Sequence, residues 1–238
     1  MTLQAIIFDV DGTLAETEEV HRQAFNEIFR EEAVGDLWPD PANGWHWSPT
    51  LYARLLQTTG GKERIAAYLR DHLDIDPAPL TGRIAGIHAR KTARFGEILA
   101  SGSLPLRPGI AETVDWARNA GLRLAIATTT SRPNVDAVCL AGFGKPAEEL
   151  FETIAAGDEV AKKKPAPDVY HLALKRLCLG ADPCLAIEDS LNGLQSAKAA
   201  GLRCLMIPSL YTADEDHRGA DAIAEELSPA RLRALAAR

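Results

Sequence analysis

Two aspartates near the N-terminus, Asp9 and Asp11, directly follow a short apolar run and are separated by a single residue. Residues two apart in an extended strand point to the same side, so these carboxylates would lie close together and repel each other. A divalent cation beside them would relieve that repulsion. The alternative for such a pair taken alone is a solvated loop or a helix N-cap, and the pair by itself leaves both interpretations open.

Three further groups of polar residues follow apolar runs, two of them directly and the third in a later loop. They are Thr128, Thr129, Thr130 and Ser131 after residues 122–127, Lys164 in the Lys162–Pro165 loop, and Glu188 with Asp189 after residues 184–187. Ligands of a parallel α/β sheet bind beyond the carboxyl ends of its strands, so we expect these groups to meet at one edge. Carboxylates are hard oxygen ligands, and no histidine or cysteine has the spacing of a soft-metal site. The set therefore favours Mg²⁺ as cofactor, and its concerted placement argues against the solvated-loop alternative.

The elements that must position these residues are short apolar runs at 5–8, 122–127, 151–155, 184–187 and 203–207. The runs are too short for helices and mostly lack polar alternation, which is typical of strands covered on both faces. Helix punctuation separates them, namely Ser131 with Pro133, Pro165, Ser190 with Gly201, and Ser228 with Pro229. Strands alternating with helices predict an α/β fold with a Rossmann-like parallel sheet.

Residues 16–100 interrupt this rhythm with helical patterns at 18–31, 62–73 and 83–99 and no apolar strand. We therefore predict an inserted all-helical cap domain at 16–100 and a core domain formed by 1–15 and 101–238. The core resumes through the sequence Leu-Arg-Pro-Gly that ends at Gly109. Residues 34–49 hold three of the four tryptophans, and we interpret them as cap packing around an irregular loop rather than as a stacking site.

The composition, 46% apolar and 25% charged, is that of an ordinary globular protein, and no segment approaches the roughly twenty apolar residues of a membrane span. The N-terminal residues lack the pattern of a targeting signal, so we expect a cytoplasmic protein. The net charge of −7 argues against nucleic-acid and anionic-membrane partners. The four scattered cysteines predict reduced, buried thiols. The sequence does not reveal the oligomeric state, for which a monomer is the working expectation.

Taken in order, Asp9-x-Asp11-Gly-Thr, Thr128, Lys164-Pro and Glu188-Asp189 resemble the four motifs of the haloacid dehalogenase superfamily of phosphotransferases. The resemblance implies a Mg²⁺-dependent phosphoric monoester hydrolase in which Asp9 is the nucleophile and forms an aspartyl phosphate. It also implies that Asp11 is the general acid and base, that Thr128 and Lys164 bind the phosphoryl group, and that Asp9, Asp11, Glu188 and Asp189 hold the metal, Asp11 through its backbone carbonyl. A cap between the first two motifs is similar to the subfamily with a helical cap.

A narrower resemblance rests on residues 14–21, 58–65, 127–131 and 188–193, which look like those of the CbbY-type phosphatases. That resemblance implies hydrolysis of xylulose 1,5-bisphosphate, a phosphorylated sugar of the Calvin cycle that inhibits Rubisco, with Thr129, Thr130 and Ser131 near the substrate. Two enzymatic alternatives stay open: a sugar-phosphate mutase resembling β-phosphoglucomutase, and a phosphatase for another small ester such as phosphoglycolate. A non-catalytic binding module is the alternative of a different class, against which all core roles are filled.

The predicted cap contains a second group of polar residues, Thr59, Gly60, Gly61, Lys62 and Arg64. Glycines let backbone amides approach an anion, and the two cations follow at a predicted helix start. We interpret this group as the binding site of the substrate phosphate that is not cleaved. The alternative is a turn followed by an exposed basic helix.

Other cap residues are candidates on weaker grounds. Glu18 and His21 lie just after the predicted start of the cap and could contact substrate hydroxyls. For His21, a histidine satisfied on its own helix face is an alternative of at least equal weight. His88, Arg90 and Lys91 could extend the same pocket. The alternative for these three is the solvated face of a helix.

Overall fold

The computed structural model describes residues 3–32, 45–102 and 104–236. The chain divides into two compact units, which we call the core unit (Met1–Glu16 with Ser103–Arg238) and the cap unit (Thr17–Gly102). The cap unit runs beyond the expected limit at residue 100, because its last helix, α4 (Thr81–Ser101), continues through Ser101.

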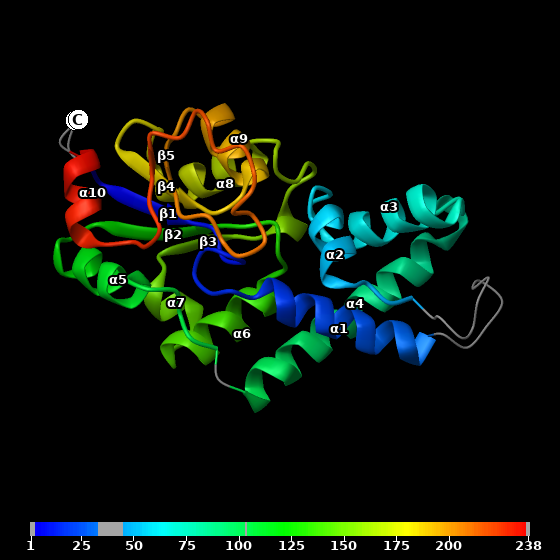
Figure 1. Ribbon diagram of the computed structural model, residues 1–238. Helices are drawn as coiled ribbons and strands as arrows, with labels where there is room; N and C mark the ends of the chain where they lie inside the picture. The colour runs from blue at the N-terminus through cyan, green and yellow to red at the C-terminus, as the bar shows by residue number, and fades with distance from the viewer. Residues whose placement is uncertain (1–2, 33–44, 103, 237–238) are drawn as a thin grey trace. The chain divides into compact units, whose positions relative to one another are not determined.

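The core unit contains a parallel sheet in the order β3-β2-β1-β4-β5-β6 (Figure 1). Its strands are β1 (Ala5–Phe8), β2 (Arg123–Ala127), β3 (Thr153–Ala155), β4 (Cys184–Glu188), β5 (Arg203–Met206) and β6 (Ala222–Ile223). The predicted Rossmann-like parallel sheet is confirmed. Strand β6 was not predicted, since two residues at a sheet edge leave no apolar run in the sequence.

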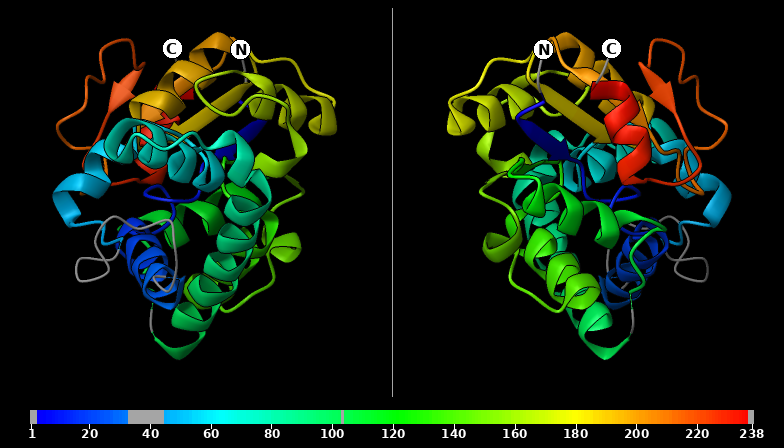
Figure 2. Two further views of the ribbon diagram at one scale, coloured as in Figure 1. Left: turned by 90° about the vertical axis from the view of Figure 1, so that its right-hand side faces the viewer. Right: turned by 90° about the vertical axis from the view of Figure 1, so that its left-hand side faces the viewer.

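Helices cover both faces of this sheet, as Figures 1 and 2 show. On one side lie α8 (Asp168–Leu177) and α9 (Leu191–Ala199), and on the other lie α5 (Ile110–Asn119), α6 (Arg132–Phe143) and α7 (Ala147–Leu150). The short η2 (Gly157–Glu159) follows β3, and α10 (Pro229–Ala236) packs against α5. Covering both faces explains why the central strands β1 and β4 are buried throughout and apolar along almost their whole length.

Two helix starts show how local signals act. The hydroxyl of Ser190 accepts a hydrogen bond from the backbone N–H of Gly193 at 3.2 Å, and so caps α9 as its sequence predicts. The helix expected to open at Pro165 begins at Asp168 instead. A turn closed by the Ala166 N–H on the Lys163 carbonyl, at 3.0 Å, precedes it. That turn leaves the intervening lysine in a loop rather than in a helix.

The register of the central strands decides which side chains can meet. Phe8, the last residue of β1, pairs with Ile126 of β2 and with Ile187 of β4. The residues that follow these three positions therefore emerge side by side at the carboxyl edge of the sheet.

The described part of the cap unit consists of helices: α1 (Glu18–Glu32), α2 (Pro49–Leu55), α3 (Gly61–Leu73), η1 (Ala78–Leu80) and α4. Its interior is aromatic, and Trp47 is fully buried with its ring centroid 4.7 Å from that of Phe25. Trp45 lies 5.0 Å from Phe29 in the same interior. The remainder of the tryptophan-rich segment, residues 34–44, lies outside the described residues. Its two described tryptophans pack inside the cap unit, as the packing interpretation requires.

The cysteines and the helices bear on two of the sequence-based expectations. Cys139, Cys184 and Cys204 are buried free thiols, whereas Cys178 is exposed, so the prediction of four buried thiols is wrong at that residue. Cys178 ends α8 in a left-handed conformation with φ 51°, outside the packed face of the helix.

Over the residues that the structure describes, no helix combines the length and the apolar character needed to cross a membrane.

Candidate active site

A buried lysine lies at the centre of the carboxyl edge of the sheet. The Nζ atom of Lys164 lies 2.7 Å from Oδ1 of Asp9 and 2.6 Å from Oε1 of Glu188, and it donates to the carbonyl of Ala127 at 2.8 Å. Only 3% of Lys164 is exposed. The loop before α8 thus brings the Lys164 ammonium group to the ends of three neighbouring strands, β1, β2 and β4.

The charges in this cluster shift one another's protonation. Burial raises the pKa of Asp9, and the nearby Asp11 carboxylate raises it further, while Lys164 and the Thr128 hydroxyl lower it. Burial raises the pKa of Glu188 to about 7, although Lys164 opposes that shift. Burial alone would lower the pKa of Lys164, but the two carboxylates outweigh it and raise the pKa above its ordinary value. The lysine is therefore charged at neutral pH.

Tyr170 completes the surroundings of Glu188. Its hydroxyl donates to Oε1 of Glu188 at 2.5 Å, and burial together with that carboxylate raises the pKa of Tyr170 well above its usual value. The sequence did not point to this tyrosine, because an aromatic residue on the apolar face of an amphipathic helix reads as core. The one available signal was its hydroxyl, which needs a partner when buried.

A metal-binding arrangement is present among the described residues. Carboxylate oxygens of Asp9, Glu188 and Asp189 lie within 4.8 Å of one another, and all three residues are buried. The Oε2 atom of Glu188 is buried without a hydrogen-bond partner among the described residues. This cluster of three buried carboxylates contains two that contact Lys164, so the donor set has excess negative charge and an unused oxygen. These features fit a hard divalent cation such as Mg²⁺.

Asp11 lies in the turn that follows β1 and is partly exposed. The turn is closed by the Gly12 N–H, which donates to the Ala15 carbonyl at 2.9 Å, and by the Leu14 N–H on the Val10 carbonyl at 2.8 Å. The structure thus places Asp11 next to the buried nucleophile candidate but nearer to solvent. This position allows a carboxyl group to exchange protons with a substrate and with water.

The threonine-rich segment after β2 divides into two parts. Thr128 is buried, and its hydroxyl bonds Asp9 and accepts from the Thr130 N–H at 3.3 Å. Thr129 and Thr130 are partly exposed, and the Thr130 hydroxyl accepts from Asn134 at 2.8 Å. The Ser131 hydroxyl is buried without a hydrogen-bond partner among the described residues. Thr128 therefore belongs to the carboxylate and lysine cluster, while the other three line the start of α6.

In the cap unit, Glu18 and Arg64 are joined through a tyrosine. The Tyr52 hydroxyl donates to Oε2 of Glu18 at 2.7 Å and accepts from Nη1 of Arg64 at 2.9 Å. Arg64 is 8% exposed and also donates from Nε to the Thr58 carbonyl at 3.3 Å. The exposed-helix alternative is therefore wrong for Arg64. Tyr52, which the sequence did not indicate, fixes the positions of both charged groups.

A second buried polar pair lies between α1 and α4. Nζ of Lys91 and Nδ1 of His21 are 2.5 Å apart, and the His21 ring stacks on Phe95 with centroids 3.9 Å apart. Lys91 is 3% exposed, so the solvated-face alternative is wrong for it. That alternative holds for Arg90, which is exposed and pairs with Glu31 at 2.8 Å.

The glycine-containing segment opens α3. Gly60 is its N-cap with φ 91°, and a side chain on Gly61 would collide with the ring of His88. Thr59 and Lys62 are partly exposed beside this helix start. At the start of α3, the backbone amides of Gly60 and Gly61 thus belong to residues without a side chain.

Comparison with known proteins agrees with this arrangement. Residues 3–201 match the family model of haloacid dehalogenase-like hydrolases. The chain is 54% identical over 226 residues to protein CbbY of Cereibacter sphaeroides, covering 95% of this chain and 93% of that protein. It is 27% identical over 202 residues to a phosphorylated carbohydrates phosphatase of Thermotoga maritima, covering 84% of this chain and 82% of that protein.

A solved structure matches over most of the length of both chains. A CbbY variant from Rhodobacter sphaeroides, crystallised in complex with xylulose-(1,5)bisphosphate, is 54% identical, covers 94% of each chain and superimposes with a TM-score of 0.86. The resemblance drawn from the sequence motifs is confirmed. The chain belongs to the haloacid dehalogenase-like hydrolase family.

Proposed function

We propose that this enzyme is a Mg²⁺-dependent phosphatase that hydrolyses a small phosphorylated sugar through an aspartyl phosphate on Asp9. The observation that carries the proposal is the pairing of Asp9 with a charged, buried Lys164 beside two further carboxylates. Membership of the hydrolase family and relatives named as phosphatases support the reaction class.

The first step is attack by Asp9 on the phosphorus of the substrate. Two unit negative charges about 4 Å apart repel by roughly 4 kcal/mol at an effective dielectric of about 20, so the approach needs nearby positive charge. Lys164 supplies one fixed cation within 2.7 Å of the nucleophile. The same charge stabilises the oxygens of the phosphoryl group during transfer, when they carry the developing charge.

Four residues would hold the cation. They are Asp9, Glu188 and Asp189 through their side chains and Asp11 through its backbone carbonyl. When bound, Mg²⁺ supplies positive charge that offsets the repulsion between the nucleophile and the phosphate. Lys164 and Tyr170 meanwhile hold Glu188 in place through hydrogen bonds at 2.6 and 2.5 Å.

Asp11 is proposed to move the protons. In the first step the bond between phosphorus and the leaving oxygen breaks while Asp11 protonates that oxygen, and the alcohol departs. In the second step Asp11 takes a proton from water, whose oxygen attacks the phosphorus of the aspartyl phosphate, so that inorganic phosphate leaves and Asp9 is regenerated. The partly exposed position of Asp11 supports both transfers.

The substrate we propose is xylulose 1,5-bisphosphate, on the strength of the relative that was crystallised with this compound. In the cap, Thr59, Gly60, Gly61, Lys62 and Arg64 would hold the phosphate that is not cleaved, with Glu18 and His21 directed to sugar hydroxyls. Thr129, Thr130 and Ser131 would contact the substrate from the core unit.

The test is a competitive substrate panel. We expect a higher kcat/KM for the ketopentose bisphosphate than for hexose phosphates or phosphoglycolate, with inorganic phosphate released in proportion to the sugar consumed. Formation of an isomerised sugar phosphate without phosphate release would identify a mutase instead. A preference for phosphoglycolate would support the phosphatase reaction but exclude the bisphosphate as the preferred substrate.

A further inference from the structure

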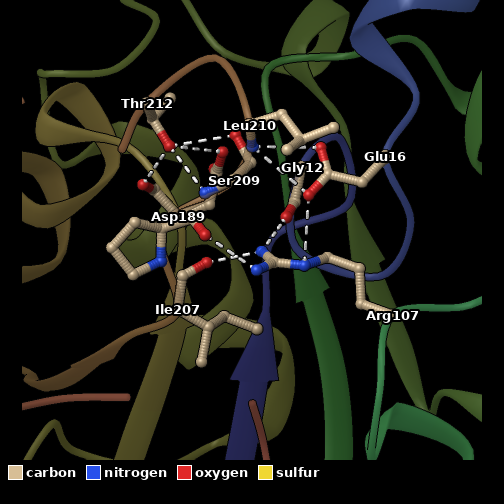
Figure 3. Close-up of polar contacts among 9 residues, drawn as sticks. Gly12, Glu16, Arg107, Asp189, Ile207, Ser209, Leu210 and Thr212 are labelled. Atoms are coloured by element: carbon tan, nitrogen blue, oxygen red, sulfur yellow. Dashed lines mark hydrogen bonds and ion pairs between the residues drawn. The ribbon is translucent and has the colours of Figure 1, made fainter. Parts of the chain in front are cut away.

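Arg107 lies in the core unit near the point where the chain returns from the cap unit, and its side chain is only 10% exposed. Its backbone N–H donates to the Leu14 carbonyl at 2.9 Å. Its guanidinium donates to the backbone carbonyls of Gly12, of Ile207 at 2.5 Å and of Pro208 at 2.7 Å (Figure 3). One side chain thus joins the turn after β1 to the loop after β5.

The first of these contacts fixes the turn that carries Asp11. Gly12 has φ +77°, its N–H is bound by the Ala15 carbonyl, and its own carbonyl is bound by Arg107. A side chain on Gly12 would collide with the carboxylate of Asp189. The turn is therefore held on both sides, with Arg107 on one and Asp189 on the other.

The other two contacts fix the 207–212 loop, which in turn holds Asp189. The Thr212 hydroxyl donates to the backbone carbonyl of Asp189 at 2.7 Å and accepts from the Ser209 N–H at 2.8 Å (Figure 3). Arg107 bonds the first two residues of this loop. The backbone at Asp189 is thus tied, through the loop, to the same guanidinium as the turn at Gly12.

A carboxylate completes the arrangement. Nε of Arg107 lies 3.4 Å from Oε1 of Glu16, and both oxygens of Glu16 accept from the Leu210 N–H at 3.3 Å. A guanidinium spreads five N–H donors over three nitrogen atoms in a rigid planar fork, whereas the three donors of a lysine all lie on one nitrogen atom. The geometry of these contacts therefore favours arginine.

We propose that Arg107 is a positioning residue that holds Asp11 and Asp189 in their working positions, through the turn at Gly12 and the 207–212 loop. The proposal rests on the proposed function for the role of Asp11 as the general acid. Misplacement of a reacting group by about 1 Å can cost on the order of a hundredfold in rate. Loss of Arg107 should therefore impair proton transfer and metal binding more than it impairs substrate binding.

The first measurement compares two esters. Hydrolysis of p-nitrophenyl phosphate expels a stable phenolate, whereas glycerol phosphate expels an alkoxide that must be protonated. For Arg107→Ala we expect kcat to fall about a hundredfold with glycerol phosphate and about tenfold or less with p-nitrophenyl phosphate, with little change in KM. Millimolar guanidinium should partly restore the loss, because it can occupy the space of the missing side chain.

The second measurement is calorimetric titration with Mg²⁺ alone, which needs no turnover. Arg107→Ala should bind Mg²⁺ about tenfold more weakly, because supporting contacts of metal ligands typically contribute about ten- to a hundredfold in affinity. Arg107→Lys keeps the charge and most of the stem, and it should fold while showing the same changes in both measurements. If the alanine variant does not fold, Arg107→Lys replaces it in both measurements.

The matched control is Arg123→Ala. Arg123 also donates from its guanidinium to a backbone carbonyl, that of Leu177 at 2.5 Å, and pairs with Glu152, but it lies at the start of β2, away from the carboxyl edge. Its loss should lower stability without changing the ratio of the two ester rates or the Mg²⁺ affinity.

Equal loss with both esters, unchanged Mg²⁺ affinity and no recovery with guanidinium would overturn the proposal and leave Arg107 a purely structural residue. The ester comparison reports on Asp11 and the Mg²⁺ titration on Asp189. A change in only one of them would overturn the part of the proposal that concerns the other residue. If the unmodified enzyme hydrolyses neither of these esters nor any member of the sugar-phosphate panel, the proposed function fails. The Mg²⁺ titration then decides the role of Arg107 by itself.

Discussion

At the scale of single residues, the candidate site combines groups whose charges depend on one another. The Glu188 side chain is fully buried and that of Asp9 is 10% exposed, and each would be costly to ionise without Lys164 between them. The burial that raises the pKa of both carboxyls also strengthens the attraction between their ionised forms and Lys164, because few water molecules are near to screen it. We therefore expect contacts with Lys164 and Thr128, rather than solvent, to favour the ionised form of Asp9, the proposed nucleophile.

Asp9→Asn should abolish turnover and leave the fold intact. The amide keeps the shape of the side chain but lacks the negative oxygen that attacks phosphorus, so we expect kcat to fall by about four orders of magnitude or more. Steady-state phosphate release and thermal unfolding measure the two effects. Asp182→Asn, at an exposed carboxylate, is the control and should keep full activity. Multiple turnovers by the Asp9 variant at a substantial rate would exclude it as the nucleophile.

At the scale of elements, helix α9 approaches the site so closely that one of its residues has no room for a side chain. A Cβ on Gly193 would collide with the carboxylate of Glu188, whereas a Cβ on Gly86, in the exposed middle of α4, would meet nothing within 4 Å. The two glycines occupy the same kind of secondary structure and differ in what faces them. Comparing alanine substitutions at the two glycines therefore distinguishes the effect of helix propensity from that of contact with the site.

Gly193→Ala should destabilise the protein by about 1 to 3 kcal/mol, because the added methyl group forces Glu188 or the helix to move. Activity should fall as well, since Glu188 would lose its contact with Lys164. Gly86→Ala is the matched control and should stabilise by roughly 0.5 to 1 kcal/mol, as expected for this change within a helix. Chemical denaturation gives both values. Equal effects of the two substitutions would mean that α9 does not press against Glu188.

The start of α3 gives a prediction about the substrate. Lys62→Ala should lower kcat/KM about ten- to a hundredfold for a bisphosphate, since a charge-assisted contact contributes roughly 1.5 to 3 kcal/mol. A monophosphate of similar size has no second phosphate and should be nearly unaffected. Arg64→Ala should also destabilise the cap unit, because it leaves Tyr52 without one of its partners. Comparable losses of Lys62→Ala for both substrates would remove this residue from bisphosphate recognition.

At the scale of the whole molecule, we expect the carboxylate cluster to make stability depend on pH and, with the proposed Mg²⁺, on metal. The pKa of Glu188 rises from 4.5 to about 7 on folding, so the folded protein retains a proton that the unfolded chain releases. In the absence of metal this carboxyl favours the folded state most at low pH, and the free energy of unfolding falls as the pH rises from about 4.5 to about 7. The raised pKa of Asp9 acts in the same direction.

Mg²⁺ should reverse this trend. The cation must displace the proton of Glu188 below pH 7, so the rise in Tm on adding Mg²⁺ should be small at pH 5.5 and larger at pH 8. At pH 8 and a hundred times Kd, Mg²⁺ should raise the free energy of unfolding by about 2.7 kcal/mol. Thermal unfolding after treatment with a chelator, with and without Mg²⁺, measures it. Activity should disappear in the chelator and return with Mg²⁺. An increase in Tm that does not depend on pH would remove Glu188 from the metal site.

The sequence by itself determined the parallel sheet, the helical insertion and the positions of polar residues at the strand ends. These features depend on local patterns, namely the length of an apolar run, helix punctuation and the residue that follows a strand. For the same reason α9 was predicted from Ser190 and Gly201, whereas the two-residue β6 was not. Asp9, Thr128 and Glu188 could be placed at one edge because the first two directly follow a strand and Glu188 is the last residue of one.

The tertiary structure alone decided which groups touch. Lys164 and Asp9 are 155 residues apart, and their contact depends on strand order and register, which no local pattern specifies. In the sequence, Tyr170 is an aromatic residue on the apolar face of a helix, and Arg107 is a cation in the segment where the core resumes. Only the structure shows that Tyr170 pairs with a carboxylate and that Arg107 binds three carbonyls. Burial of a polar group is a property of the packed molecule, because its cost is set by neighbours that arrive from distant parts of the chain.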